Sequence, residues 1–258
     1  MERSDFDSYT AELLATCAQH PRVIGLVLMG STAAPHRIDE WSDHDFAVIV
    51  EPGAAEELRG DLSWLPRLSA LVSCGRELHD GFCGIYDDGH VIEFGVTDLA
   101  GLATWHANAY DVVLDRGGVT DAMCLVAARE KPTSLFDARR EFAILLATLL
   151  VGAGRARRGE TLSASGALRG RAVEVLLGLL AQLGTADRTM LDDLDVRRRF
   201  ERAYPEIGAE LERAQQKQPA VLALKLLEIT ERELGSTSSY PSVAAATVRR
   251  ALNRAADR

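Results

Sequence analysis

Two aspartates, one residue apart, stand at the start of an apolar segment. Asp43 and Asp45 lead into residues 46–50 (FAVIV), a β-branched run typical of a buried strand. Side chains at positions i and i+2 of a strand share a face, so the two carboxylates are predicted to lie side by side, with His44 on the opposite face. Carboxylates this close repel each other unless a cation neutralises them, and Mg²⁺ prefers carboxylate, water and phosphate oxygens. The pair therefore predicts a Mg²⁺ site.

A second chemical signal, Gly30-Ser31, directly follows the apolar run of residues 23–29 (VIGLVLM). Glycine lets a ligand approach the backbone closely, and serine offers a hydroxyl group. The two residues are expected to open a short helix, whose N-terminus would present free N–H groups and a partial positive charge. This segment is therefore predicted to bind a phosphate group.

A third acid, Glu93, interrupts another apolar run, residues 90–96 (HVIEFGV). A charged side chain inside a strand costs free energy unless something pairs with it, and a nearby metal ion would offset that cost. An exposed position at a sheet edge is the alternative explanation. Together, the three acids and Gly30-Ser31 predict a site for a nucleoside triphosphate with bound Mg²⁺.

This order of motifs resembles the nucleotidyltransferase superfamily, whose signature is Gly-Ser followed at about this distance by Asp-x-Asp. The match is closer to the aminoglycoside 6-adenylyltransferases (streptomycin adenylyltransferases). The resemblance covers roughly the first 160 residues and is carried by residues 30–33, 39–50, 90–96, 110–116, 131–132 and 140–142.

The resemblance implies an enzyme that transfers AMP from ATP to a hydroxyl group of a small molecule, with an aminoglycoside antibiotic as a candidate acceptor. It also implies two Mg²⁺ ions. Glu141 would be the general base from the helical half, although a charge on a solvated helix face is the alternative. The implied catalytic residues are Asp43, Asp45, Glu93 and Glu141, the first three also as metal ligands, and the implied nucleotide-binding residues are Gly30, Ser31 and Thr32.

The sequence departs from this family at one informative position. Many members carry Arg after Gly-Ser, where this chain has Thr32. A phosphate contact is thereby lost, and the cations that could replace it are Arg37, Arg129 and Lys131. Acids cluster less in the helical half than a pocket for an aminoglycoside would require, and the candidates for contact with a cationic acceptor are Glu141, Glu160 and Glu174. Trp41 is expected to pack in the core; the alternatives are packing beside the site or against a nucleotide.

Periodicity predicts an α+β fold with two domains. Strands are expected at residues 23–29 and 46–50, in a hairpin over 82–96 with its turn at 87–89, and near residue 110. Helices are expected at 6–17, 54–72 and 98–110, the last with Asp98 as N-cap. After Lys131-Pro132 only helical patterns remain, at residues 136–158, 166–183, 189–203, 205–216, 220–234 and 243–256. We therefore expect a mixed-sheet nucleotidyltransferase domain (1–130) and a helical acceptor-binding domain (131–258).

Composition limits the classes of partner. The 258 residues carry a formal net charge of −9, which disfavours nucleic-acid binding. Four scattered cysteines without a C-x-x-C pair indicate reduced thiols in a cytoplasmic protein, and neither a secretory signal nor an apolar run of membrane-spanning length is present. A monomer or homodimer is expected. Two other functions stay open: a protein-modifying (antitoxin-like) adenylyltransferase and a non-catalytic nucleotide-binding regulatory protein.

Overall fold

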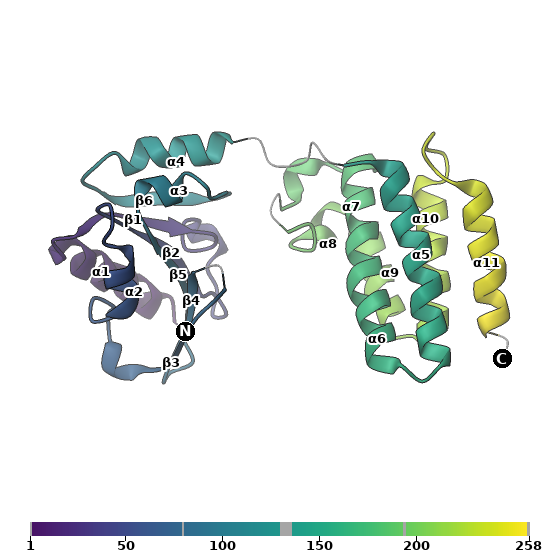
Figure 1. The fold of residues 1–258 in the computed structure, drawn as a ribbon, viewed down its shortest axis with the longest axis horizontal. Helices are drawn as coiled ribbons and strands as arrows, with labels where there is room; N and C mark the ends of the chain where they lie inside the picture. Colours follow the sequence, from purple (N-terminus) through teal and green to yellow (C-terminus); the bar gives the residue numbers. More distant parts are fainter. Residues whose placement is uncertain (1, 79, 130–135, 193–194, 257–258) are drawn as a thin grey trace. The chain divides into compact units, whose positions relative to one another are not determined.

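The computed structural model describes residues 2–78, 80–129, 136–192 and 195–256. The chain divides into two compact units, Met1–Lys131 and Pro132–Arg258, and each is described by itself. Lys131-Pro132, where the sequence pattern changes, lies outside the described residues. The first unit holds a mixed sheet with helices and the second is helical (Figure 1), so the predicted α+β fold class is confirmed.

The sheet of the first unit has six strands in the order β3-β4-β5-β2-β1-β6. Neighbouring strands are antiparallel except for β2 and β5, which are parallel. The strands are β1 (Val23–Met29), β2 (His44–Val50), β3 (Leu71–Arg76), β4 (Gly81–Tyr86), β5 (Val91–Thr97) and β6 (Tyr110–Asp115).

Each face of the sheet has its own apolar core, because side chains alternate along the strands. In β2, Phe46 and Val48 pack with residues of α1 (Arg3–Gln19) and α2 (Ala55–Gly60) on one face. Ala47 and Ile49 pack on the other face with residues of α3 (Leu99–Leu102) and α4 (Val119–Ala128). By the same alternation, the Asp45 side chain points to the face on which Ala47 and Ile49 pack.

Two local predictions are confirmed at turns and caps. The Asp98 carboxylate accepts a hydrogen bond from the Gly101 N–H at the start of α3. In the β4–β5 hairpin, Gly89 has φ +84° and donates its N–H to the Tyr86 carbonyl. Both features are set by residues close in sequence, which is why the sequence predicts them.

The helices predicted at 54–72 and 98–110 are too long. The first ends at Gly60, beyond which Asp61 is extended, and residues 71–76 form β3 at the edge of the sheet. β3 was not predicted, because it depends on hydrogen bonds to β4 and not on a local pattern. The second helix ends at Leu102, and α4, also not predicted, follows β6.

The second unit packs its long helices around one apolar core, and α5, α7, α10 and α11 lie side by side (Figure 1). Its elements are α5 (Ala138–Arg157), α6 (Thr161–Ser165), a π-helical segment (Gly166–Ala172), α7 (Val173–Leu183), α8 (Phe200–Ala203), α9 (Pro205–Gln215), α10 (Pro219–Leu234) and α11 (Ser242–Ala256). Within the described ranges, none of the helices combines the length and apolar character of a membrane span.

The helix predicted at 189–203 is wrong for most of its length. Among the residues of this stretch that the structure describes (189–192 and 195–203), only a three-residue 3₁₀ turn (Arg188–Met190) and α8 are helical. The carboxylates of Asp192 and Asp195 accept hydrogen bonds from the backbone N–H groups of Asp195 and Arg197. Such side-chain bonds compete with the helical ladder, so they favour turns.

Two glycines on α5 test how tightly the helical unit is packed. A methyl group at Gly152 would lie 2.6 Å from Cγ of the fully buried Leu168, whereas one at Gly154 would meet only Arg158 Nη1 at 3.5 Å. Gly154→Ala should raise the free energy of unfolding by about 0.5–1 kcal/mol through helix propensity. Gly152→Ala should instead lower it by about 1 kcal/mol, because overpacking outweighs that gain.

Urea unfolding followed by far-UV circular dichroism measures the free energy of unfolding of both variants. The comparison is valid if the slope of that free energy against urea concentration is the same for both. A stabilised Gly152→Ala variant would show that α5 and the π-helical segment can move apart without loss, contrary to the close packing described.

Candidate active site

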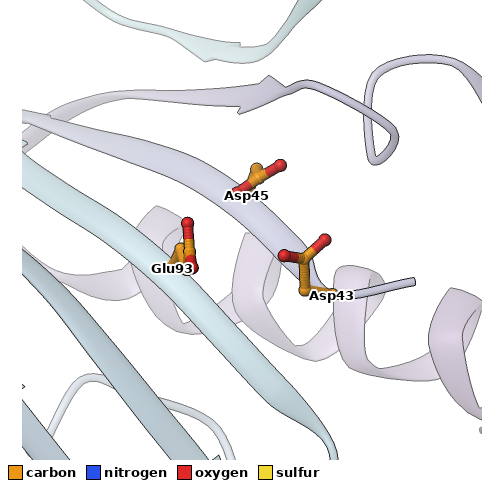
Figure 2. Close-up of side chains that lie close together, drawn as sticks. All are labelled: Asp43, Asp45 and Glu93. Atoms are coloured by element: carbon orange, nitrogen blue, oxygen red, sulfur yellow. The ribbon is translucent and has the colours of Figure 1, made fainter. Parts of the chain in front are cut away.

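Three carboxylates meet on one face of the sheet. One ligand oxygen from each of Asp43, Asp45 and Glu93 lies within 4.8 Å of the others. Figure 2 shows Asp43 and Asp45 at the start of β2 and Glu93 on the neighbouring strand. Asp43 and Asp45 are half-buried, and Glu93 is exposed. The structure therefore brings together the three acids that the sequence selects.

The parallel pairing of β2 with β5 produces this cluster. Asp45 is opposite Glu93 in the register of the two strands, so their side chains leave the same face at neighbouring positions. Asp43, one residue before β2, shares that face by the i, i+2 rule. Since no local sequence pattern specifies the strand pairing, the closeness of Glu93 to the two aspartates is a tertiary result.

Gly30 lies against the carboxylate of Asp45. Its φ is +56°, and a methyl group added there would lie 2.4 Å from Asp45 Oδ2. The Gly30 N–H donates to the Ala109 carbonyl, which ties the end of β1 to the chain entering β6. Glycine is required here for both its backbone conformation and its missing side chain.

The segment after Gly30 is a turn, not the start of the expected helix. Ala33 N–H bonds the Met29 carbonyl, Ala34 N–H bonds the Ser31 carbonyl, and only Pro35–Arg37 is helical, as a single 3₁₀ turn. The helix-dipole contribution expected at Gly30-Ser31 is therefore absent from this described segment. Phosphate binding by Ser31 stays a prediction that would rest on its hydroxyl and on the backbone of the turn.

Thr32 holds the start of β2 in place. Its side chain is buried, accepts a hydrogen bond from the Asp45 N–H at 2.9 Å and donates to the Asp43 carbonyl at 3.4 Å. The hydroxyl that the sequence suggests for nucleotide is thus engaged in fixing the backbone of both aspartates. A direct contact between Thr32 and nucleotide stays a prediction.

His44 lies on the opposite face, as predicted. It is fully buried, stacks on Phe6 and bonds His90 Nε2 through Nδ1 at 2.7 Å. Burial and the neighbouring imidazole lower the pKa of His44 to about 3, and burial lowers the pKa of His90 to about 4. Both rings are therefore neutral near pH 7 and act as structural groups behind the acid cluster.

Two residues beside the cluster were missed in the sequence. Cys83 on β4 is directly opposite Glu93; burial raises the pKa of its thiol, and the nearby Glu93, Glu77 and Asp43 carboxylates raise it further. Trp105 packs over Gly95, where an added methyl group would lie 2.4 Å from its ring. In the sequence, Gly95, two residues after Glu93, was the signal that a large side chain could pack over this strand.

Trp41 does not pack in the core, because 87% of its surface is exposed. Its loop is held by the Asp39 carboxylate, which accepts from the Trp41 N–H and the Ser42 hydroxyl. Arg37 is half-buried in the same connection, and Arg129 donates to the Ala103 carbonyl. Lys131, the third cation suggested for phosphate, lies outside the described residues.

Glu141 belongs to the helical unit, in the first turn of α5. Its side chain is 18% exposed and accepts a hydrogen bond from Arg140 Nη2 at 2.8 Å. Glu141 and Glu174 line a cavity of about 200 Å³ together with Phe136, Arg171, Val175, Gly178 and Val196. Glu160 pairs with Arg158 and does not line this cavity.

Comparisons with known proteins leave the family open. No family model matches the chain, and no curated protein matches it significantly. Among solved structures, this chain is similar to an aminoglycoside 6-adenyltransferase from Bacillus subtilis. The two are 12% identical, the match covers 96% of this chain and 90% of that chain, and the TM-score is 0.31. So low an overall likeness carries no functional weight, and the geometry of the acid cluster bears on function instead.

The contact between Gly30 and Asp45 can be tested against Gly53, which also has positive φ (+80°) but no atom within 4 Å of an added methyl group. Gly53→Ala should lower the free energy of unfolding by roughly 1–2 kcal/mol, the cost of a left-handed conformation for a residue with a side chain. Gly30→Ala should cost more, because it also displaces the Asp45 carboxylate.

Chemical unfolding monitored by the fluorescence of the tryptophans, all of which lie in the first unit, compares the two variants. Equal losses of stability for Gly30→Ala and Gly53→Ala would mean that the Asp45 carboxylate is not held against the Gly30 backbone.

Proposed function

We propose that this chain is a Mg²⁺-dependent nucleotidyltransferase that transfers AMP from ATP to a hydroxyl group of a small molecule. The observation that carries the proposal is the cluster of Asp43, Asp45 and Glu93 beside the turn at Gly30-Ser31. An aminoglycoside is a candidate acceptor, since the net charge of −9 favours cationic molecules.

The donor set of the cluster fits Mg²⁺. All three groups are carboxylates, which are hard oxygen ligands, and they approach within 4.8 Å of one another on one face. Asp43 and Asp45 would hold the ion that also binds the triphosphate, and Glu93 would share in holding a second. Bound Mg²⁺ would supply charge stabilisation for the phosphate oxygens.

The protein groups would orient the triphosphate for an in-line displacement. Gly30 permits close approach of the ligand to the backbone, and the Ser31 hydroxyl can donate to a phosphate oxygen. The acceptor oxygen would form a bond to the α-phosphorus while the bond to the β-phosphate oxygen breaks and pyrophosphate leaves. Most of the rate enhancement would then come from positioning and electrostatic stabilisation.

The acceptor hydroxyl must lose a proton as it attacks. Glu93 and Glu141 are the two candidates for taking it: Glu93 by its place in the cluster, and Glu141 by the family resemblance. A carboxylate within hydrogen-bond reach of the hydroxyl would act as the general base. The two assignments are separable by experiment, since Glu93 is also a proposed metal ligand and Glu141 is not.

The first test is pyrophosphate release by the full chain with Mg²⁺, each nucleoside triphosphate and a panel of aminoglycosides. Asp45→Asn should lower the rate at least about a hundredfold, because a ligand charge is lost where negative charge develops. Asp111→Asn, which neutralises an exposed aspartate on β6, is the matched control and should leave the rate unchanged.

Equilibrium binding of ATP in the presence of Mg²⁺ gives the second readout. A chain that binds no nucleotide under these conditions is not a nucleotidyltransferase. Nucleotide binding without pyrophosphate release for any acceptor would favour the regulatory alternative, and release only with a protein acceptor would favour the protein-modifying one.

Glu141→Gln tests the base in the helical unit. If Glu141 takes the proton, this variant should lower kcat by about 10²–10⁴-fold and leave ATP binding intact. Glu174→Gln, which removes a charge from the same cavity, should have a much smaller effect. Full turnover by Glu141→Gln would mean that another group takes the proton, and Glu93 would then be the candidate.

A further inference from the structure

A cavity of about 730 Å³ opens in the helical unit, distinct from the small cavity at Glu141. It lies between the π-helical segment and α7 on one side and α8 and α9 on the other. Its volume is in the range of about 300–1,000 Å³ typical of small-molecule sites. The residues that line it include Arg169, Val173, Leu177, Phe200, Glu201 and Glu212.

The floor of this cavity is apolar. Val173, Leu177, Phe200 and Leu211 line it, and each is less than a tenth exposed. Phe200 stacks on Tyr204, with 4.9 Å between the ring centroids, which fixes the position of its ring. A flat apolar group could therefore rest on a preformed surface.

Two exposed carboxylates, Glu201 of α8 and Glu212 of α9, line the rim. The side chain of Glu201 runs along α9 at Gly208, where an added methyl group would lie only 2.8 Å from Glu201 Cγ. Glu212 is four residues beyond Gly208 on α9, which places it on the same face about one helical turn away. Both acids line the cavity, and neither forms an ion pair with any residue that the structure describes.

The two cations of the rim, in contrast, are already engaged. Arg169 donates through Nε and Nη2 to the carbonyls of Gln215 and Lys217, where α9 ends. Arg197 pairs with Asp195 at 2.9 Å. The acids are thus the charged groups of the rim that remain available to a ligand.

We propose that this cavity binds a small amphiphilic cation. Its apolar or aromatic body would lie on Val173, Leu177 and Phe200, and its ammonium or guanidinium group would lie between Glu201 and Glu212. The site belongs to the helical unit alone and does not depend on the nucleotide chemistry proposed for the acid cluster.

Three probes of one shape and different charge test the proposal on the full chain: phenethylamine, 2-phenylethanol and phenylacetate. Titrations followed by methyl NMR report on Val173, Leu177 and Leu211. Phenethylamine should shift these resonances saturably, with an affinity at least about fivefold above that of the alcohol, in line with a pair of exposed charge contacts. Phenylacetate should bind more weakly than the alcohol.

Variants locate the site. Glu201→Gln combined with Glu212→Gln should reduce the affinity for phenethylamine to that for the alcohol, whereas Glu206→Gln, an exposed acid of α9 outside the cavity, should not change it. Ala209 is half-exposed and lines the cavity, so Ala209→Phe should fill part of it and abolish the shifts that phenethylamine causes. The proposal is overturned if the alcohol binds as well as the amine, if the double variant binds normally, or if no probe gives saturable shifts.

Discussion

Repulsion among three carboxylates is the constraint around which the first unit is organised. Asp43, Asp45 and Glu93 approach within 4.8 Å, although like charges at that distance destabilise one another. The β2–β5 register, the Thr32 hydroxyl and the close approach of Gly30 all hold the acids in place. Three separate features of the fold therefore position the same group of carboxylates.

The opposite face of the same strands shows how the sheet tolerates this charge. His44 and His90 lie behind the cluster and hydrogen-bond to each other, with Thr10 accepting or donating at the other end. Because burial depresses the pKa of both rings, neither supplies a positive charge at neutral pH. The two faces of β2 therefore differ in charge: one carries carboxylates and the other neutral imidazoles.

The parts of this structure that the sequence predicts are those with a local cause. Alternation along β2 separates Asp45 from His44, and Gly89 and Asp98 form a turn and a cap within a few residues. β3 was missed because only pairing with β4 makes it a strand, and residues 189–203 were misassigned because helical spacing does not reveal turns built by Asp192 and Asp195. The exposure of Trp41 and the place of Cys83 beside Glu93 likewise depend on contacts distant in sequence.

The two units also differ in what positions their polar groups: paired strands in the first, and interrupted helices in the second. In the first, the three carboxylates lie on or next to two paired strands, whose register fixes their positions within narrow limits. In the second, the large cavity occurs where regular helix is interrupted, beside a π-helical segment and the four-residue α8. Such interruptions leave unfilled space between helices and often coincide with functional sites. If the proposed cation site exists, a few side chains on α8 and α9 would set what it binds, without any change in the strands that carry the acids.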